Sequence, residues 1–518
     1  MRQASYFNFF PGSILGLLGW LAVLPAEGKD HYLVLAGGQS AANNQVSLEK
    51  NVLFFRKVLK ETDPTATLTE YFSSGNEDIR SVQFESAETD VPPANEYMAR
   101  LFASTDYLKL QYRQHQLGKV AGVTSSANLQ GWFDEHEKNF ESGDRLVIYA
   151  TAHGGRSRDK QKPDNTMLLL WNRQSIDVRG LQENLKKLPK DITVILVMAQ
   201  CFSGGFAHTI FNDTESDSGN FDPSVCGFFA TVTSREAAGC TPDINEEAYD
   251  EFSSHFWAAM RGEDRLGNPI GSADYDGNGQ VSFDEAYAYT VLASRNIDIP
   301  MKTSGAFLRA RSQFPDDKGV SNDQLLKRHT PYSRALALAE PVERKLLEGL
   351  SERLGLKGES RYAAAEKEAG EIEGKRADLK KQYDAKKRVW EGHRNSIRST
   401  LYGRWPELSN LFTEQSIGLL TEASQDFVDV VESHPRFKAW NKVAMEREAI
   451  DEERFALEKE WVQYIRFLRA HNNAVLAENL RILADPDDLS RFKKIRQAER
   501  GGMSTGPTAL EKAIPRSE

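Results

Sequence analysis

The chain has 518 residues, of which 40% are hydrophobic and 27% are charged. At this length an ordinary globular composition predicts about two to four domains. The formal net charge of −10 argues against nucleic acid or an anionic membrane surface as a partner of the whole chain.

Residues 1–28 resemble a secretory signal peptide. A single charge, Arg2, precedes an apolar run from Ile14 to Leu24, which is short for a bilayer span of about 20 residues. The small residues Ala26 and Gly28 then fit a signal-peptidase site. We expect a mature chain without a membrane span, secreted or periplasmic. The alternative is an uncleaved membrane anchor.

Strand-like and helix-like segments alternate from His31 to about Arg311. Near-continuous apolar runs predict buried strands, and the segments between them have helical spacing. The predicted strands are 31–38, 145–155, 192–201 and 227–234, and the predicted helices are 46–59, 178–188 and 246–262. This order predicts an α/β fold, a mostly parallel sheet with helices on both faces.

The composition changes in the C-terminal third of the chain. The segments 360–405 and 437–482 are rich in Glu, Lys, Arg and Ala, and apolar residues recur along them at helical spacing. They predict two long helices in a coiled-coil-like hairpin or bundle. We therefore expect an α/β domain over 29–314, a linker over 315–341, a helical domain over 342–500 and a disordered tail over 501–518. The helices could bind a protein partner, cover a site or self-associate, or their charged faces could simply be solvated.

His153 and Cys201 each stand where a predicted strand ends. Ligands of such sheets bind beyond the carboxyl ends of the strands. The intervening stretch has room for one hairpin (167–171) and one helix, so we expect the two strands to be neighbours. A cysteine nucleophile needs a thiolate, a nearby imidazole and N–H groups for the oxyanion. A helix opening at Ser203 would favour the thiolate, with N–H groups left free around Phe202.

The segments YATAHGG and MAQCFSGG resemble the paired motifs of the caspase-like clan of cysteine peptidases. The legumain-like branch is the more similar, because ATVTSREAAGC and AYDEFSSHFW follow. The resemblance covers roughly residues 30–310 and implies a caspase-like sheet and a cysteine endopeptidase. In this family Cys201 would attack the scissile carbonyl to form a thioester, and His153 would give a proton to the leaving amine. The N–H groups of Gly154 and Cys201 would hold the oxyanion.

The resemblance also implies other site residues. Asn44, or equally Asn43, would match the asparagine that orients the histidine. Asp250 would match a pocket aspartate of legumains, whereas Phe202 stands where they carry an acidic residue, so a preference for asparagine is not expected. His208 and His255 are interpreted as structural. Two alternatives remain, a non-catalytic scaffold of the same fold and a transpeptidase that passes the thioester to an amine.

Residues 274–285, DYDGNGQVSFDE, fit the calcium-binding loop of an EF-hand. The expected ligands, with a further water-mediated contact from Ser282, are Asp274, Asp276, Asn278, the Gln280 carbonyl and Glu285. The segment before the loop does not look helical, so we expect a lone loop that holds a structural Ca²⁺. The alternative is a turn that binds no ion. No organic cofactor is expected.

The three cysteines leave one thiol unpaired if the chain is exported. Cys226 and Cys240 flank a short apolar stretch and could form a disulfide, which would leave Cys201 free. Alternatively, all three stay reduced.

Overall fold

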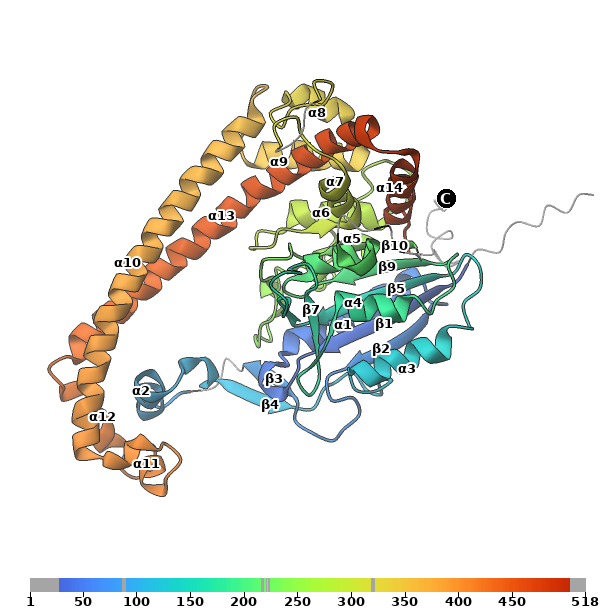
Figure 1. Ribbon diagram of the computed structural model, residues 1–518. Coiled ribbons are helices and arrows are strands. Elements are labelled where there is room, and N and C mark those ends of the chain that lie inside the picture. Colours follow the sequence, from blue (N-terminus) through green and yellow to red (C-terminus); the bar gives the residue numbers. More distant parts are fainter. Residues whose placement is uncertain are drawn as a thin grey trace, which may run out of the picture.

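The computed structural model describes residues 28–85, 90–215, 219, 221, 224–317 and 322–503 (Figure 1). The predicted signal peptide, apart from Gly28, and the predicted tail beyond Met503 lie outside these residues. Within the described part of the chain, no helix is both long and apolar enough to cross a membrane.

A six-stranded sheet forms the centre of the α/β part, with the strands in the order β2-β1-β5-β9-β10-β11. Neighbouring strands are parallel except for β11, which runs antiparallel to β10. The strands are β1 (Asp30–Gly37), β2 (Thr67–Phe72), β5 (Arg145–Ala152), β9 (Thr193–Met198), β10 (Ser224–Phe229) and β11 (Met301–Lys302). The predicted α/β fold with a mostly parallel sheet is confirmed.

Helices cover both faces of this sheet, which explains why its strands are apolar on both sides. In β1, Tyr32 and Val34 pack toward one face, and Leu33 and Leu35 toward the other. The first face is covered by α1 (Val46–Thr62), α5 (Phe252–Arg261) and α6 (Phe283–Ala293), and the second by α3 (Ser126–His136), α4 (Val178–Leu185) and α7 (Thr303–Arg311).

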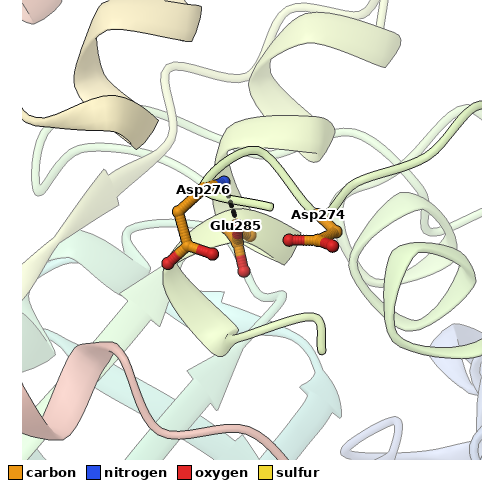
Figure 2. A group of neighbouring side chains, drawn as sticks. All are labelled: Asp274, Asp276 and Glu285. Carbon is orange, nitrogen blue, oxygen red and sulfur yellow. Dashed lines mark hydrogen bonds between the residues drawn. The ribbon is translucent and has the colours of Figure 1, made fainter. Parts of the chain in front are cut away.

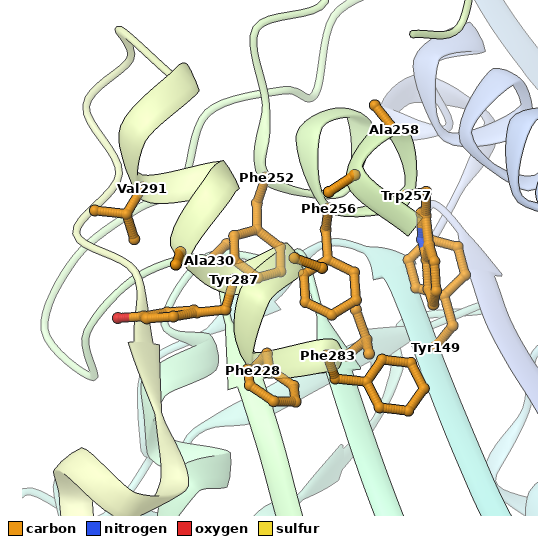
Figure 3. Close-up of a cluster of buried hydrophobic side chains, with 14 of the residues drawn as sticks. Tyr149, Phe228, Ala230, Phe252, Phe256, Trp257, Ala258, Phe283, Tyr287 and Val291 are labelled. Atoms are coloured by element: carbon orange, nitrogen blue, oxygen red, sulfur yellow. The ribbon is translucent and has the colours of Figure 1, made fainter. Parts of the chain in front are cut away.

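Aromatic rings fill the space between the first face and its helices. Trp257 of α5 lies 5.2 Å from the ring of Tyr149 on β5, and Phe256 stacks on Phe283 of α6 (Figure 3). Trp257 and Phe256 are buried. Large buried rings of this kind contribute much of the hydrophobic stabilisation of a core.

Two smaller sheets are inserted between the main strands. The pair β3 (Val82–Glu85) and β4 (Leu110–Arg113) is joined by a segment that includes α2 (Pro93–Phe102). The second consists of β6 (Gly154–Gly155), β7 (Met167–Leu170) and β8 (Gln174–Asp177). The predicted hairpin between His153 and Cys201 is thus the β7–β8 hairpin, and α4 is the helix that follows it.

The C-terminal region is helical, as predicted, but the helices begin within the predicted linker 315–341, where α8 forms. It contains α8 (Tyr332–Leu338), α9 (Pro341–Arg353), α10 (Arg361–Arg404), α11 (Glu414–Gly418), α12 (Ser424–Ser433), α13 (Phe437–Leu483) and α14 (Pro486–Glu499). The helices α10 and α13 lie antiparallel along each other and are here called the arm (Figure 1). Lys386 of α10 pairs with Glu446 of α13 at 2.5 Å, and Trp390 stacks on Trp440.

Both ends of the arm contact the α/β part. At its tip, Leu401 of α10 and Trp440 of α13 share an apolar cluster with Met98 of α2. At its base, Leu476 of α13 and Ile495 of α14 belong to the core of the sheet. The arm is therefore anchored to the sheet at one end and to the inserted helix α2 at the other.

Candidate active site and calcium loop

His153 and Cys201 follow adjacent strands at the same edge of the sheet. Strands β5 and β9 pair in parallel, with Ala150 opposite Met198. Gly154 brings the two main chains together, because a Cβ atom there would lie 1.8 Å from the carbonyl oxygen of Cys201. The prediction that these two strands are neighbours is confirmed.

The imidazole of His153 is held by two hydrogen-bond acceptors. Its Nε2 lies 2.8 Å from the carbonyl oxygen of Asn43 and 2.9 Å from Oε1 of Gln45. Because both partners accept, Nε2 carries the proton, and Nδ1 is the nitrogen that can take one up. Burial lowers the pKa of His153, and the hydrogen bond to Asn43 offsets this only in part. The imidazole is therefore neutral at pH 7 and suited to act as a base.

Of the two asparagines that the sequence left open, Asn43 contacts the histidine. The side chain of Asn44 instead accepts the N–H of Gly38 at 2.8 Å and donates to the carbonyl of Ser81 at 3.0 Å. Asn44 thus fastens the loop after β1. The contact of Gln45 with His153 was not predicted. The only feature of the sequence that could have pointed to Gln45 is its position directly before α1.

The sulfur of Cys201 lies against Ala237, in the loop after β10. The Ala237 N–H donates to Sγ at 3.3 Å, and the Ala237 carbonyl lies 3.7 Å from it. Burial raises the pKa of the Cys201 thiol, the Ala237 N–H lowers it, and the carboxyl groups of Glu236 and Asp298 raise it. The net shift is upward, so the thiol is the resting form.

The segment after Cys201 differs from the prediction. It is a 3-10 helix, η3 (Ser203–Ile210), preceded by Phe202 in the left-handed region with φ of 57°. The N–H of Phe202 is not free, because it donates to the Arg235 carbonyl at 2.8 Å. The expected lowering of the thiol pKa is not found, because burial, the largest influence on Cys201, raises that pKa.

The two predicted pocket residues have partners inside the protein. Phe202 is buried, and the guanidinium of Arg156 lies 4.9 Å from its ring centre. Asp250 accepts from His255 Nε2 at 2.8 Å and from the N–H of Arg295 at 3.1 Å. Burial raises the pKa of Asp250, but the hydrogen bond from His255 and other contacts outweigh it, so the net shift is downward. These contacts tie the start of α5 to the segment after α6, and they give His255 the structural role expected of it.

The predicted calcium loop brings three carboxylates together. Oxygen atoms of Asp274, Asp276 and Glu285 lie within 4.8 Å of one another, and Figure 2 draws the three side chains at the loop. Asp274 accepts N–H groups from Gly277, Asn278 and Gly279, while Glu285 accepts those of Tyr275 and Asp276. The loop is thus wound around a cluster of hard oxygen donors, the type of ligand that Ca²⁺ prefers.

The remaining loop positions also follow the pattern. Asn278 accepts the N–H of Gln280 at 2.9 Å, and Ser282 forms a reciprocal cap with Glu285 at the start of α6. Gly277 and Gly279 have positive φ values of 75° and 86°, which glycine adopts without strain. No helix enters the loop, since 262–273 is irregular, in agreement with the expected lone loop.

The chain after α14 lies beside this loop. Ser282 and Gly502 form an antiparallel bridge, and the N–H of Phe283 donates to the Gly501 carbonyl at 2.8 Å. Met503 is buried against the core. The prediction that the disordered tail begins at residue 501 is wrong for these three residues, because Gly501 and Gly502 pair with residues 282–283 and Met503 packs into the core.

All three cysteines are free. Cys226 is fully buried in β10, within the core on the α5 side of the sheet. Cys240 lies in the loop after β10, where burial and the neighbouring Cys201 raise its pKa. The suggested disulfide between Cys226 and Cys240 is not formed.

Comparison with known proteins adds little. No family model matches the chain, and no curated protein matches it. A solved structure, protein GSU0716 from Geobacter sulfurreducens, is similar at a TM-score of 0.29 and 12% sequence identity, over 50% of this chain and 88% of that chain. A likeness this slight indicates no function.

Proposed function

We propose that this protein is a caspase-like cysteine endopeptidase that hydrolyses peptide bonds through Cys201 and His153. One observation carries the proposal: two adjacent parallel strands end in an imidazole and a thiol whose main chains touch through Gly154. The two acceptors on Nε2 of His153 support it, since they prepare the other ring nitrogen to accept a proton.

The proposed reaction begins with both groups neutral. When a peptide binds, Nδ1 of His153 takes the proton of the Cys201 thiol, and the sulfur attacks the scissile carbonyl carbon. The carbonyl electron pair moves to the oxygen, which the N–H groups of Gly154 and Cys201 would hold. Removing one such donor typically slows a reaction by about a hundred- to a thousand-fold.

Breakdown of this intermediate returns the proton. The C–N bond breaks, the leaving nitrogen takes the proton from Nδ1, and a thioester remains on Cys201. Water then attacks the thioester and gives a proton to Nδ1. The acid product leaves as that proton returns to the sulfur. An amine in place of water would make the same chain a transpeptidase.

We also propose that residues 274–285 bind a structural Ca²⁺. The side chains of Asp274, Asp276, Asn278 and Glu285 and the carbonyl of Gln280 would be its ligands. The clustering of oxygen atoms of Asp274, Asp276 and Glu285 within 4.8 Å of one another supports the proposal. The N-terminal apolar run supports export of the chain to the calcium-rich outside of the cell or to the periplasm.

A non-catalytic scaffold of the same fold is the second candidate. The observation that favours it is the contact of Ala237 with the sulfur, together with the raised pKa of the Cys201 thiol. A scaffold would leave recognition to the arm and would not need an accessible thiol.

A peptide library that scans the residue before the scissile bond separates the two candidates. It is assayed with the full chain, with Cys201→Ala and with His153→Ala, each with and without Ca²⁺. We expect cleavage by the unaltered chain only, and covalent labelling of Cys201 by a thiol-directed peptide that depends on His153. A folded protein that neither cleaves nor labels in any condition would leave the scaffold as the answer.

A further inference from the structure

The short segment 235–238 lies directly against the candidate nucleophile. Ala237 contacts the sulfur of Cys201 through its N–H, and the Arg235 carbonyl accepts the N–H of Phe202. The side chain of Cys201 is only partly exposed as a result. Whatever holds 235–238 in place therefore also holds the groups that contact the sulfur.

The first attachment of this segment runs to the arm. The guanidinium of Arg235 forms an ion pair with Glu458 of α13, which also pairs with Arg376 of α10 at 2.8 Å. Both guanidinium groups lie 5.3 Å from the ring centre of Trp461. Burial raises the pKa of Glu458, but the two arginines outweigh it, so its carboxylate stays charged. An ion pair shared between two arginines over an aromatic ring is more constrained than a lone surface pair.

The second attachment runs from α13 through the turn that follows α6. Arg466 is buried and donates to the carbonyl groups of Val291, Ser294 and Asp298 at 3.1, 3.0 and 2.8 Å. Asp298 in turn accepts the N–H of Ala238 at 2.7 Å. Helix α13 therefore contacts both ends of 235–238. It contacts Arg235 directly and Ala238 through the turn that contains Asp298.

We propose that α13 positions the segment 235–238 over Cys201, so that docking of the arm sets how accessible the sulfur is. Arg235, Glu458 and Arg466 are positioning residues in this arrangement, since they act through the segment and do not touch the sulfur. The inference rests on the proposed function in one respect, the role of Cys201 as the nucleophile. The accessibility of the thiol itself is measurable without any substrate.

The test compares the rate at which iodoacetamide alkylates Cys201 in the full chain, followed by mass spectrometry of the Cys201 peptide from pH 6 to 9. Glu458→Gln keeps the shape of the side chain and removes its charge. Glu453→Gln, an exposed position on the same helix, is the matched control. We expect Glu458→Gln to raise the rate roughly 2- to 5-fold, the size expected for weakening a partly exposed ion pair. The control should leave it unchanged.

A double-mutant cycle gives the second measurement. If Arg235→Gln and Glu458→Gln act through the same contact, the double variant should alkylate no faster than the faster single variant. The pH midpoint of alkylation should also fall in Glu458→Gln, because the sulfur becomes less buried. Equal rates and equal midpoints in Glu458→Gln and the unaltered chain would overturn the inference. Should the variants alkylate as expected while no peptide is ever cleaved, the inference stands and the proposed function fails.

Discussion

The side-chain oxygen of Gln45 and the Nε2 atom of His153 lie 2.9 Å apart, and a main-chain carbonyl shares the same N–H. The glutamine therefore fixes which nitrogen carries the proton without adding a charge. A carboxylate in its place would stabilise the imidazolium.

Gln45→Glu should shift the pH dependence of the site. A carboxylate next to the ring raises the pKa of His153, which burial now holds below its usual value. The neutral base then appears only at higher pH, so the acidic limb of the activity profile moves up by about one unit. NMR titration of the ring checks the pKa without a substrate. Gln130→Glu, exposed on α3, should leave both profiles in place, and an unmoved His153 titration in Gln45→Glu would contradict the assignment.

Gly154→Ala should destabilise the fold as well as disturb the site. The added methyl group would lie 1.8 Å from the Cys201 carbonyl, so one of the two main chains has to move. We expect a loss of about 1–3 kcal/mol in the free energy of unfolding, measured in urea. In Gly131→Ala, in the middle of α3, the added Cβ atom would meet no atom within 4 Å. This variant should instead raise the free energy of unfolding by about 0.5–1 kcal/mol. Two variants of equal stability would show that the strands do not meet at Gly154.

Calcium should raise the melting temperature of the chain, and Asp274→Asn should abolish the gain. A ligand present at 100 times its Kd stabilises the folded state by about 2.7 kcal/mol. Asp274 organises three N–H groups of the loop, so the variant loses both a ligand and the winding of the loop. Calorimetric titration with CaCl₂ provides the measurement. Glu247→Gln, at an exposed site outside the loop, should bind Ca²⁺ as tightly as the unaltered chain does. If Asp274→Asn also binds Ca²⁺ that tightly, the loop is not the binding site.

Asp298 should make stability depend on pH near neutrality. Burial raises the pKa of its carboxyl to about 7, although the N–H of Ala238 and the charge of Arg466 lower it. Because the folded pKa lies above the unfolded one, the folded state holds the proton more tightly. The stabilisation is full below about pH 4 and is lost as the pH rises to about 7, by roughly 4 kcal/mol at most. Asp298→Asn should flatten this dependence in urea unfolding at pH 5 and 8. Asp191→Asn, at an exposed position, should not change it.

The parts of the fold that the sequence predicted are those encoded locally. The strands that carry His153 and Cys201 are buried on both faces, so their apolar runs are unbroken. The two edge strands were not predicted, for different reasons. Strand β2 is partly exposed and polar, and strand β11 has only two residues. Local pattern carries little information about either kind.

The site was predictable to the same extent. The loop 274–285 and the two strand ends are contiguous motifs. The structure places His153 and Cys201 after neighbouring strands and brings three carboxylates of the loop together. The contact of Gln45 with His153 joins residues 108 positions apart, and that of Arg235 with Glu458 joins residues 223 apart. Such contacts depend on how whole elements pack, and a single sequence gives no pattern for them.

The bridge between Ser282 and Gly502 has a consequence for how the chain matures. Thr62 of α1 hydrogen-bonds to the sulfur of Met503, across 441 positions, and Ile495 completes a face of the sheet. The core of the α/β part is therefore complete only once α14 and the segment 501–503 are in place. Contacts this distant in the sequence lower the rate of folding, because a long stretch of chain must be closed into a loop before they can form.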